Sequence, residues 1–308
     1  MGVNFYHTAG TPEDMDADYL VHATALGGNI RAMGIRSTQI CREALRIHGT
    51  SPVATAALGR FLSGSLLLAE DLKEGSLSQT TILRGDGPLE GMTAVCDNKG
   101  NVRGYANHPV VENYYQKPGK LDVGKAVGKG TLSVIRDIGY GNPYIGTVEL
   151  LSGEIAEDFN YYLASSEQIP SVVCLGVLLE NETVSVAGGF LIQVLPGADE
   201  ETISYLEKRA GGGFPDVTFL LKEGLNPEKI LDMFLGDPEI KYLSAHPVNY
   251  SCPCSREKME SNLVALGSVE LDSLEKEKDG ITLECHFCEN KYHFTPLDIS
   301  NLSKTGNL

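Results

Sequence analysis

Four cysteines near the end of the 308-residue chain stand in two close pairs. One residue separates Cys252 from Cys254, and two residues separate Cys285 from Cys288. Two such pairs bring four soft ligands to one point, which is the donor set of a tetrahedral zinc site with no open position. A closed site cannot activate a water molecule. The spacing therefore predicts one Zn²⁺ per chain, with a structural or a redox role rather than a catalytic one.

Other candidate ligands and thiols are expected to stay outside this site. His246, His286 and His293 are the nearby histidines, but four cysteines already complete a tetrahedral coordination shell.

The three remaining cysteines lie in apolar surroundings. Cys41 falls in a predicted helix, whereas Cys96 and Cys174 fall in predicted strands, so each is expected to behave as a small, buried hydrophobic side chain.

The overall composition excludes several functional classes. The net charge of −16 opposes binding to a phosphate backbone, so we expect no nucleic-acid partner. No basic start followed by an apolar run is present, which predicts a cytoplasmic protein without a signal peptide. In a reducing cytoplasm, clustered cysteines indicate metal or redox chemistry rather than structural disulfides.

No residue pattern predicts an enzyme. We find no nucleophile–base arrangement and no carboxylates at catalytic spacing. The segment 124–130 is rich in glycine and lysine, but it has three residues between its first two glycines and Gly130 after Lys129, unlike a phosphate-binding loop. A connection between strands is the simpler interpretation.

Residues 1–198 are expected to form a large α+β domain with mainly antiparallel sheets. A helix is predicted over 29–48. The most apolar helix candidate covers 54–72; its small residues and Arg60 make it too polar to span a membrane, and apolar residues nearly all round it indicate that it is buried. Glycine-rich turns at 85–88 and 98–101 indicate hairpins. Because helices and strands come in runs without regular βαβ spacing, the class is α+β.

Residues 199–245 have a different character. The stretch contains ten acidic and five basic residues, two short helical segments at 199–209 and 226–235, and three consecutive glycines from Gly211 to Gly213. Its apolar residues suffice for one face only, so it is predicted to fold conditionally, by packing that face on a neighbour. An ordinary helical linker remains the alternative.

Residues 246–308 should form the zinc-binding module. The first cysteine pair precedes a predicted helix, and the second lies in a hairpin between strands 281–284 and 291–294. About sixty residues build little core, so metal binding is expected to supply most of the folding free energy.

Several motifs resemble the heat-shock protein 33 family. The first is Cys-x-Cys-Ser-Arg-Glu at 252–257, followed by Cys-x-x-Cys at 285–288 with Tyr292 and Phe294 after it. Further landmarks follow the family's order along the chain: Gly85-Asp86-Gly87-Pro88, Arg103-Gly104, Gly128-Lys129-Gly130, Tyr144-Ile145-Gly146, Ser166-Glu167-Gln168-Ile169-Pro170, Ala187-Gly188-Gly189 and Gln193-Val194-Leu195-Pro196. An ordered series of this length is highly specific.

The resemblance implies a redox-regulated, ATP-independent holdase chaperone. In such proteins the reduced, zinc-bound form is a largely inactive monomer. Oxidation joins Cys252 to Cys254 and Cys285 to Cys288, zinc is released, the adjoining segment unfolds, and a homodimer binds unfolding client proteins through exposed apolar surface.

Two other functions are left open by the cysteine spacing. A structural zinc-ribbon adaptor or RNA-associated protein would use the same four ligands, although the acidic surface argues against RNA. A thiol–disulfide oxidoreductase would need its cysteine pair near a βαβ unit, which the chain lacks.

Overall fold

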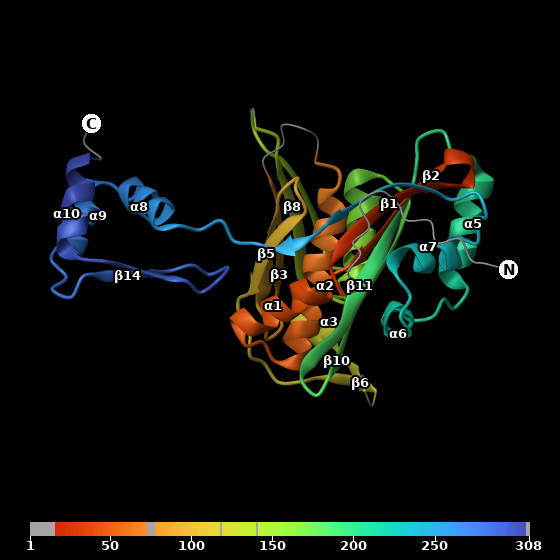
Figure 1. Ribbon diagram of the computed structural model, residues 1–308, viewed down its shortest axis with the longest axis horizontal. Helices are drawn as coiled ribbons and strands as arrows, with labels where there is room; N and C mark the ends of the chain where they lie inside the picture. Colours follow the sequence, from red (N-terminus) through yellow and green to blue (C-terminus); the bar gives the residue numbers. More distant parts are fainter. Residues whose placement is uncertain (1–15, 73–77, 118, 140, 306–308) are drawn as a thin grey trace. The chain divides into compact units, whose positions relative to one another are not determined.

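A computed structural model describes residues 16–72, 78–117, 119–139 and 141–305 (Figure 1). Its contacts divide the chain into two compact units, residues 1–250 and residues 251–308. Residues 1–15, on which the expectation about a signal peptide depends, lie outside the described residues.

The first unit contains the two large sheets and most of the helices. Its elements in chain order are β1 (Tyr19–Ala25), η1 (Leu26–Gly28), β2 (Ile30–Arg36), α1 (Thr38–His48), α2 (Pro52–Ala69), β3 (Ser78–Gly85), β4 (Gly91–Cys96), β5 (Asn101–Ala106), β6 (Tyr115–Lys117), β7 (Lys120–Leu121), α3 (Val123–Val127), β8 (Gly130–Asp137), β9 (Tyr144–Glu149), α4 (Ala156–Tyr162), η2 (Leu163–Glu167), β10 (Ser171–Glu180), β11 (Thr183–Val194), α5 (Glu200–Gly211), α6 (Val217–Lys222), α7 (Pro227–Leu235), β12 (Lys241–Pro247) and β13 (Asn249–Tyr250).

The two large sheets confirm the α+β class with mainly antiparallel pairing. One has five antiparallel strands in the order β10-β11-β2-β1-β12. The other has six strands in the order β13-β5-β4-β3-β8-β9, and only the short β13–β5 pair is parallel. Strands β6 and β7 form a small separate ribbon.

Helix α2 lies between the two sheets and forms the centre of the main core (Figure 1). The expectation that it is too polar for a membrane span was wrong, because its length and hydropathy would suit one, but 89% of that window is buried inside the protein. Leu62 and Leu66, for example, pack in one cluster with Met33 of the five-stranded sheet and Met92 of the other. The predicted buried helix is therefore confirmed as the core helix of this unit.

The helix predicted over 29–48 is wrong in its first part. Residues 30–36 form strand β2, and the helix begins only at Thr38. Met33 and Ile35 face the core around α2, whereas Ile30 and Ala32 face the opposite side of the sheet. Because both faces are covered, the strand lacks the alternation of apolar and polar residues that identifies a half-buried strand.

The second face of the five-stranded sheet is covered by helices α6 and α7. Close contact is possible because small residues lie beneath them. A Cβ atom added to Gly34 of β2 would lie 2.9 Å from the Pro227 Cβ of α7, and one added to Gly176 of β10 would lie 2.5 Å from Thr218 Cγ2 of α6. Helices α6 and α7 of the 199–245 segment therefore pack closely on this face of the sheet.

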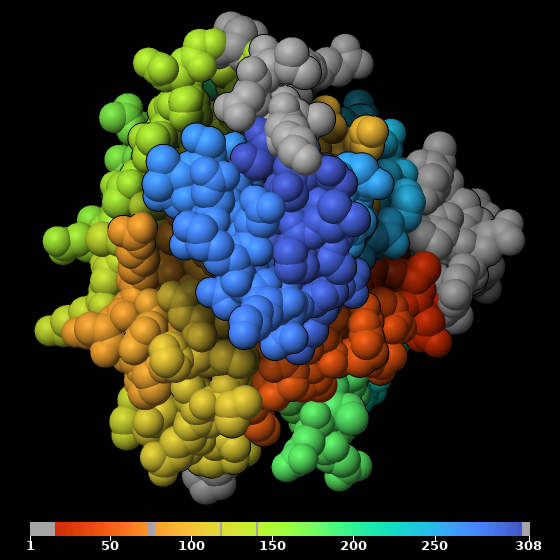
Figure 2. Space-filling view, turned by 90° about the vertical axis from the view of Figure 1, so that its left-hand side faces the viewer, coloured from red at the N-terminus to blue at the C-terminus, as the bar shows by residue number. Residues whose placement is uncertain are grey.

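The second unit is small and has its own core. Its elements are α8 (Arg256–Ala265), α9 (Ser268–Leu274), β14 (Ile281–Glu284), β15 (Lys291–Phe294) and α10 (Pro296–Thr305). Four side chains form the buried centre, namely Leu263, Leu271, Phe294 and Ile299. Figure 2 shows the surface of the second unit, at the blue end of the colour scale, as one continuous body.

A buried carboxyl group in the first unit should make its stability depend on pH. Asp18 Oδ2 accepts a hydrogen bond of 2.7 Å from the Ile40 backbone N–H, while its Oδ1 is buried without a hydrogen-bond partner. Burial raises the pKa of Asp18 from 3.8 to about 6, against the lowering effect of backbone hydrogen bonds. The folded state therefore binds this proton more tightly than the unfolded state does.

We expect the Asp18→Asn variant to lose this pH dependence. In the wild type, the contribution is fully present below pH 4 and disappears as the pH rises through 6, an effect of roughly 3 kcal/mol. Urea unfolding of both proteins from pH 4 to 7.5 gives the difference between their free energies of unfolding at each pH. The contributions of other titrating groups are common to both proteins and cancel in this difference. Parallel pH profiles for the two proteins would contradict the prediction.

Candidate metal centre

The four predicted cysteine ligands lie on two short segments of the second unit. Cys252 and Cys254 precede α8, which begins after Ser255, and the Ser255 side chain caps the helix by accepting from the Lys258 N–H. Cys285 and Cys288 occupy the turn between β14 and β15. The predicted hairpin over 281–294 is confirmed with the same strand bounds.

Local backbone hydrogen bonds shape the turn of the second pair. The Cys285 N–H donates to the Asn290 carbonyl oxygen, and the Cys285 carbonyl accepts from the N–H groups of Cys288 and Glu289. Glu289 adopts a positive φ of 57°, which closes the turn. The two sulfurs are thereby held on the same side of the hairpin.

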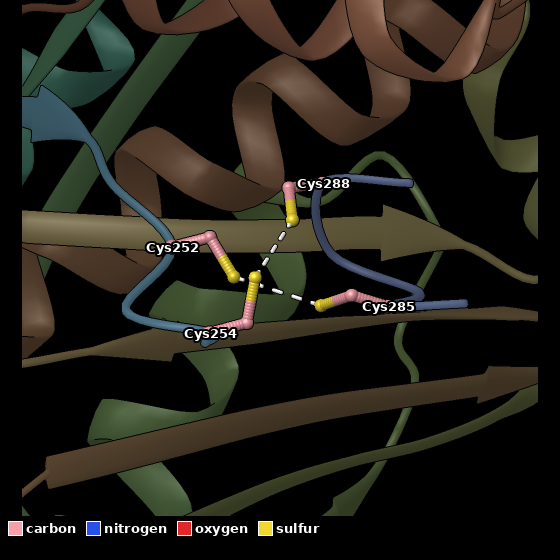
Figure 3. Close-up of side chains that lie close together, drawn as sticks. All are labelled: Cys252, Cys254, Cys285 and Cys288. Carbon is pink, nitrogen blue, oxygen red and sulfur yellow. Dashed lines mark hydrogen bonds between the residues drawn. The ribbon is translucent and has the colours of Figure 1, made fainter. Parts of the chain in front are cut away.

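All four sulfurs converge on one point (Figure 3). The Cys252 and Cys285 Sγ atoms are 3.7 Å apart, the Cys254 and Cys288 Sγ atoms are 3.2 Å apart, and every sulfur lies within 4.8 Å of the others. In a tetrahedral zinc site, Zn–S bonds of about 2.3 Å place the sulfurs about 3.8 Å from one another. The cluster therefore fits one metal ion.

The four thiols differ in how readily they lose a proton. Burial opposes ionisation of Cys254, but hydrogen bonds from the Tyr292 hydroxyl, at 3.1 Å, and from neighbouring thiols lower its pKa to about 7. Burial raises the pKa of Cys252 to about 11 and also raises that of Cys288. One thiolate is thus stabilised at the expense of its neighbours, as expected for thiols that share one site.

Two side chains support the cluster in ways that the sequence did not reveal. Tyr292 packs against the small core, and its hydroxyl also contacts Cys254. The Arg256 guanidinium donates to the His293 carbonyl oxygen at 2.7 Å, pairs with Asp298, and lies 4.3 Å from the centre of the Phe294 ring. It therefore joins α8 to the hairpin and to α10.

The three histidines considered as competing ligands are not members of the cluster. His286 and His293 are exposed, and His293 Nδ1 is hydrogen-bonded to the Thr282 hydroxyl. His246 belongs to strand β12 of the first unit. The sulfur cluster in the described residues contains the four cysteines alone.

The other cysteines have the environments expected of inert thiols. Cys41 and Cys96 are buried, and Cys174 is half-buried in β10. Burial raises the pKa of all three thiols, that of Cys174 to about 11. Few of their sulfurs are ionised at neutral pH, so they are poor nucleophiles.

Comparison with known proteins places this chain among close relatives. Residues 18–295 match the family model described as Hsp33 protein. The chain is 47% identical to a 33 kDa chaperonin of Ruminiclostridium cellulolyticum, with 93% of this chain and 98% of that protein covered. It is 44% identical to the 33 kDa chaperonin of Bacillus subtilis, with 92% and 98% covered.

A solved structure has the same fold. The crystal structure of a 33 kDa chaperonin from Thermotoga maritima, a heat-shock protein 33 homologue, superposes with a TM-score of 0.84 at 33% sequence identity. The alignment covers 94% of this chain and 98% of that one. With the family model spanning both units, these matches show that the chain belongs to the heat-shock protein 33 family.

Proposed function

We propose that this chain is a redox-regulated, ATP-independent holdase chaperone that is inactive when reduced and bound to zinc. Family membership supports the chaperone activity. The observation that carries the regulation is the convergence of four thiols in a unit whose core, among the described residues, is centred on four buried apolar side chains. One Zn²⁺ bound to these sulfurs would supply most of the free energy that keeps the unit folded.

Oxidation acts on the cysteine side chains. In each pair, two thiols and one molecule of hydrogen peroxide yield one disulfide and two molecules of water, so two electrons pass from sulfur to the peroxide. We propose the pairs Cys252–Cys254 and Cys285–Cys288. A sulfur in a disulfide is no longer a thiolate ligand, so the unit loses its metal-dependent stability.

Residues 199–245 are the proposed conditional element between a core of residues 1–198 and a switch of residues 246–308. Their apolar face packs on the five-stranded sheet, where Leu221, Ile230, Leu231 and Phe234 are buried. Along the chain, the end of edge strand β12 and the short strand β13 lie between this segment and Cys252. Unfolding of the switch is proposed to release the helices and to expose the sheet face beneath them.

The exposed surface would bind client proteins. On the sheet side it consists of apolar residues from three strands, β1, β2 and β11: Val21, Ala23, Ala25, Ile30, Ala32, Val186, Phe190 and Ile192. A contiguous apolar surface of this kind binds unfolded chains and also favours association of two copies. We propose that the oxidised form is a homodimer, that it acts in the cytoplasm, and that it catalyses no reaction.

A light-scattering assay with a thermally unfolding client protein tests the proposal. The reduced, zinc-bound chain should leave aggregation unchanged, and the peroxide-treated chain should suppress it while releasing one zinc per chain. A Cys174→Ala variant should behave as the wild type does, because that thiol lies outside the cluster. Zinc release without any suppression of client aggregation would show that the cluster has only a structural role, and it would overturn the proposed regulation.

The two disulfides should form in a defined order. Pro253 stiffens the backbone between Cys252 and Cys254, and a disulfide across one residue is already strained. We therefore expect the Cys285–Cys288 bridge to accumulate first under mild peroxide treatment, as measured by alkylation and mass spectrometry. In a Pro253→Gly variant, the two bridges should accumulate at more similar rates. Earlier accumulation of the Cys252–Cys254 bridge would show that strain does not set the order.

A further inference from the structure

A second cluster of metal-binding side chains lies in the first unit. The His22 Nε2 atom is 2.6 Å from Glu70 Oε2, and the His246 Nε2 atom is 3.1 Å from Glu70 Oε1. The two imidazole rings are 6.1 Å apart between centroids. One nitrogen of each histidine and one oxygen of the glutamate lie within 4.8 Å of one another. Both imidazoles hydrogen-bond to Glu70, and two histidine nitrogens and a carboxylate thus gather in one place, where a metal ion could replace the shared protons.

The backbone directs these side chains to one place. His22 pairs with Ser244 across the β1–β12 ladder, so His246, two residues further along, projects from the same face of the sheet. The ladder is irregular between His22 and Ala23, the kind of bulge that reorients side chains beside functional sites. Glu70 follows the last residue of α2, which packs against this face.

The donor set is that of a zinc site with an open position. Two histidines and one glutamate occur as the three protein ligands of catalytic zinc sites, in which water occupies the fourth place. With bonds of about 2.0–2.1 Å to nitrogen and oxygen, ligand atoms lie about 3.3 Å apart in a tetrahedral site. The His246–Glu70 distance of 3.1 Å is close to this value, whereas the His22–Glu70 distance of 2.6 Å is that of a hydrogen bond, so the His22 ring would have to move away from the carboxylate to make room for a metal ion.

The space beside the cluster leaves room for a further ligand. A hollow of about 350 Å³ is bordered by Glu70 and His246 together with Ala69, Asn98 and Lys99. The three proposed ligands are partly accessible, with 15–32% of each side chain exposed. An ion could therefore reach the site from solvent, and Lys99 would favour a water-derived or anionic fourth ligand over a second cation.

We propose that His22, Glu70 and His246 form a second binding site for a divalent transition-metal ion, with zinc as the expected occupant. The site would join three segments that are distant in sequence: β1, the end of α2, and β12. Since β12 is an edge strand, a bound ion would hold it on the sheet. Metal binding at this site requires neither chaperone activity nor oxidation of the cysteines.

Cobalt titration of the reduced, full-length chain tests the site after its cysteine cluster has been filled with zinc. The wild type should bind one further equivalent of Co²⁺, with visible d–d bands and no thiolate-to-cobalt charge-transfer band. The His22→Ala and His246→Ala variants should lose this equivalent. A His108→Ala variant should keep it, because His108 forms a separate exposed pair with Glu90.

A second measurement covers the case in which an alanine variant misfolds. Hydrogen exchange of the zinc-filled wild type, with and without excess Co²⁺, should show slower exchange in β12 and unchanged exchange in β14 and β15. Glu70→Gln keeps the size of the side chain, and it should abolish the slowing. The proposal is overturned if the only new absorption is the thiolate band, or if β12 exchanges at the same rate with and without the metal.

Discussion

Replacing Cys288 by serine is expected to unfold residues 251–308 while the two large sheets of the first unit stay folded. The variant loses one of four sulfur ligands, and structural zinc contributes about 10–16 kcal/mol in small modules at neutral pH. Four buried apolar side chains cannot replace a contribution of that size. Hydrogen exchange should show protection lost in β14 and β15 but retained in β3 and β8, and zinc content should fall.

The Cys174→Ala variant is the matched control for this experiment. It also removes one thiol, but from a half-buried position outside the sulfur cluster. Zinc content and the protection of β14 should therefore remain at wild-type values. If the Cys288→Ser variant loses its zinc while β14 and β15 stay protected, the small core suffices by itself and zinc cannot be the switch.

Replacing Phe234 by alanine is expected to produce chaperone activity without oxidation. Phe234 of α7 is 2% exposed and packs against Phe190 of β11 and Phe214, with ring centroids 4.8 and 5.0 Å away. Truncation of a buried phenylalanine costs about 3–5 kcal/mol. The loss falls on the contact between α7 and the sheet, so α5–α7 should detach while the reduced cysteine cluster retains zinc.

Hydrogen exchange combined with the aggregation assay measures this effect under reducing conditions. Phe219→Ala is the matched control, because Phe219 lies on neighbouring α6 but is 56% exposed, and its loss should change stability by no more than about 0.5 kcal/mol. The Tyr242→Phe variant should weaken the packing of α7 less than Phe234→Ala does. It removes only the hydroxyl that hydrogen-bonds to the Glu228 carbonyl oxygen and to Asp232. Detached helices without any chaperone activity would exclude the sheet face as the client-binding surface.

The cysteine cluster could be predicted from the sequence because its geometry is local. Spacings of one and two residues bring the sulfurs of each pair together whatever the rest of the fold does, and a short hairpin positions the second pair. The burial of helix α2 could also be predicted from the sequence, because apolar residues surround the whole helix and favour a buried environment. The ordered landmarks of the family extended these local inferences to the whole chain.

Other features depended on which surfaces meet in three dimensions. Strand β2 was mistaken for the start of a helix because both of its faces are covered by apolar residues. The need for glycine at position 34 follows only from the close approach of Pro227 in the folded structure. Helix α6 and strand β12 were not predicted for a similar reason: six- and seven-residue segments have little intrinsic signal and are stabilised by the sheet against which they lie.

The clearest case is the cluster of His22, Glu70 and His246. Gaps of 48 and 176 residues separate these positions, so no motif connects them. They meet because the antiparallel β1–β12 ladder places both histidines on one face and α2 ends against that face. Ligands that are close in sequence can be recognised from spacing alone, whereas ligands contributed by separate elements become neighbours only when the packing of those elements determines their distances.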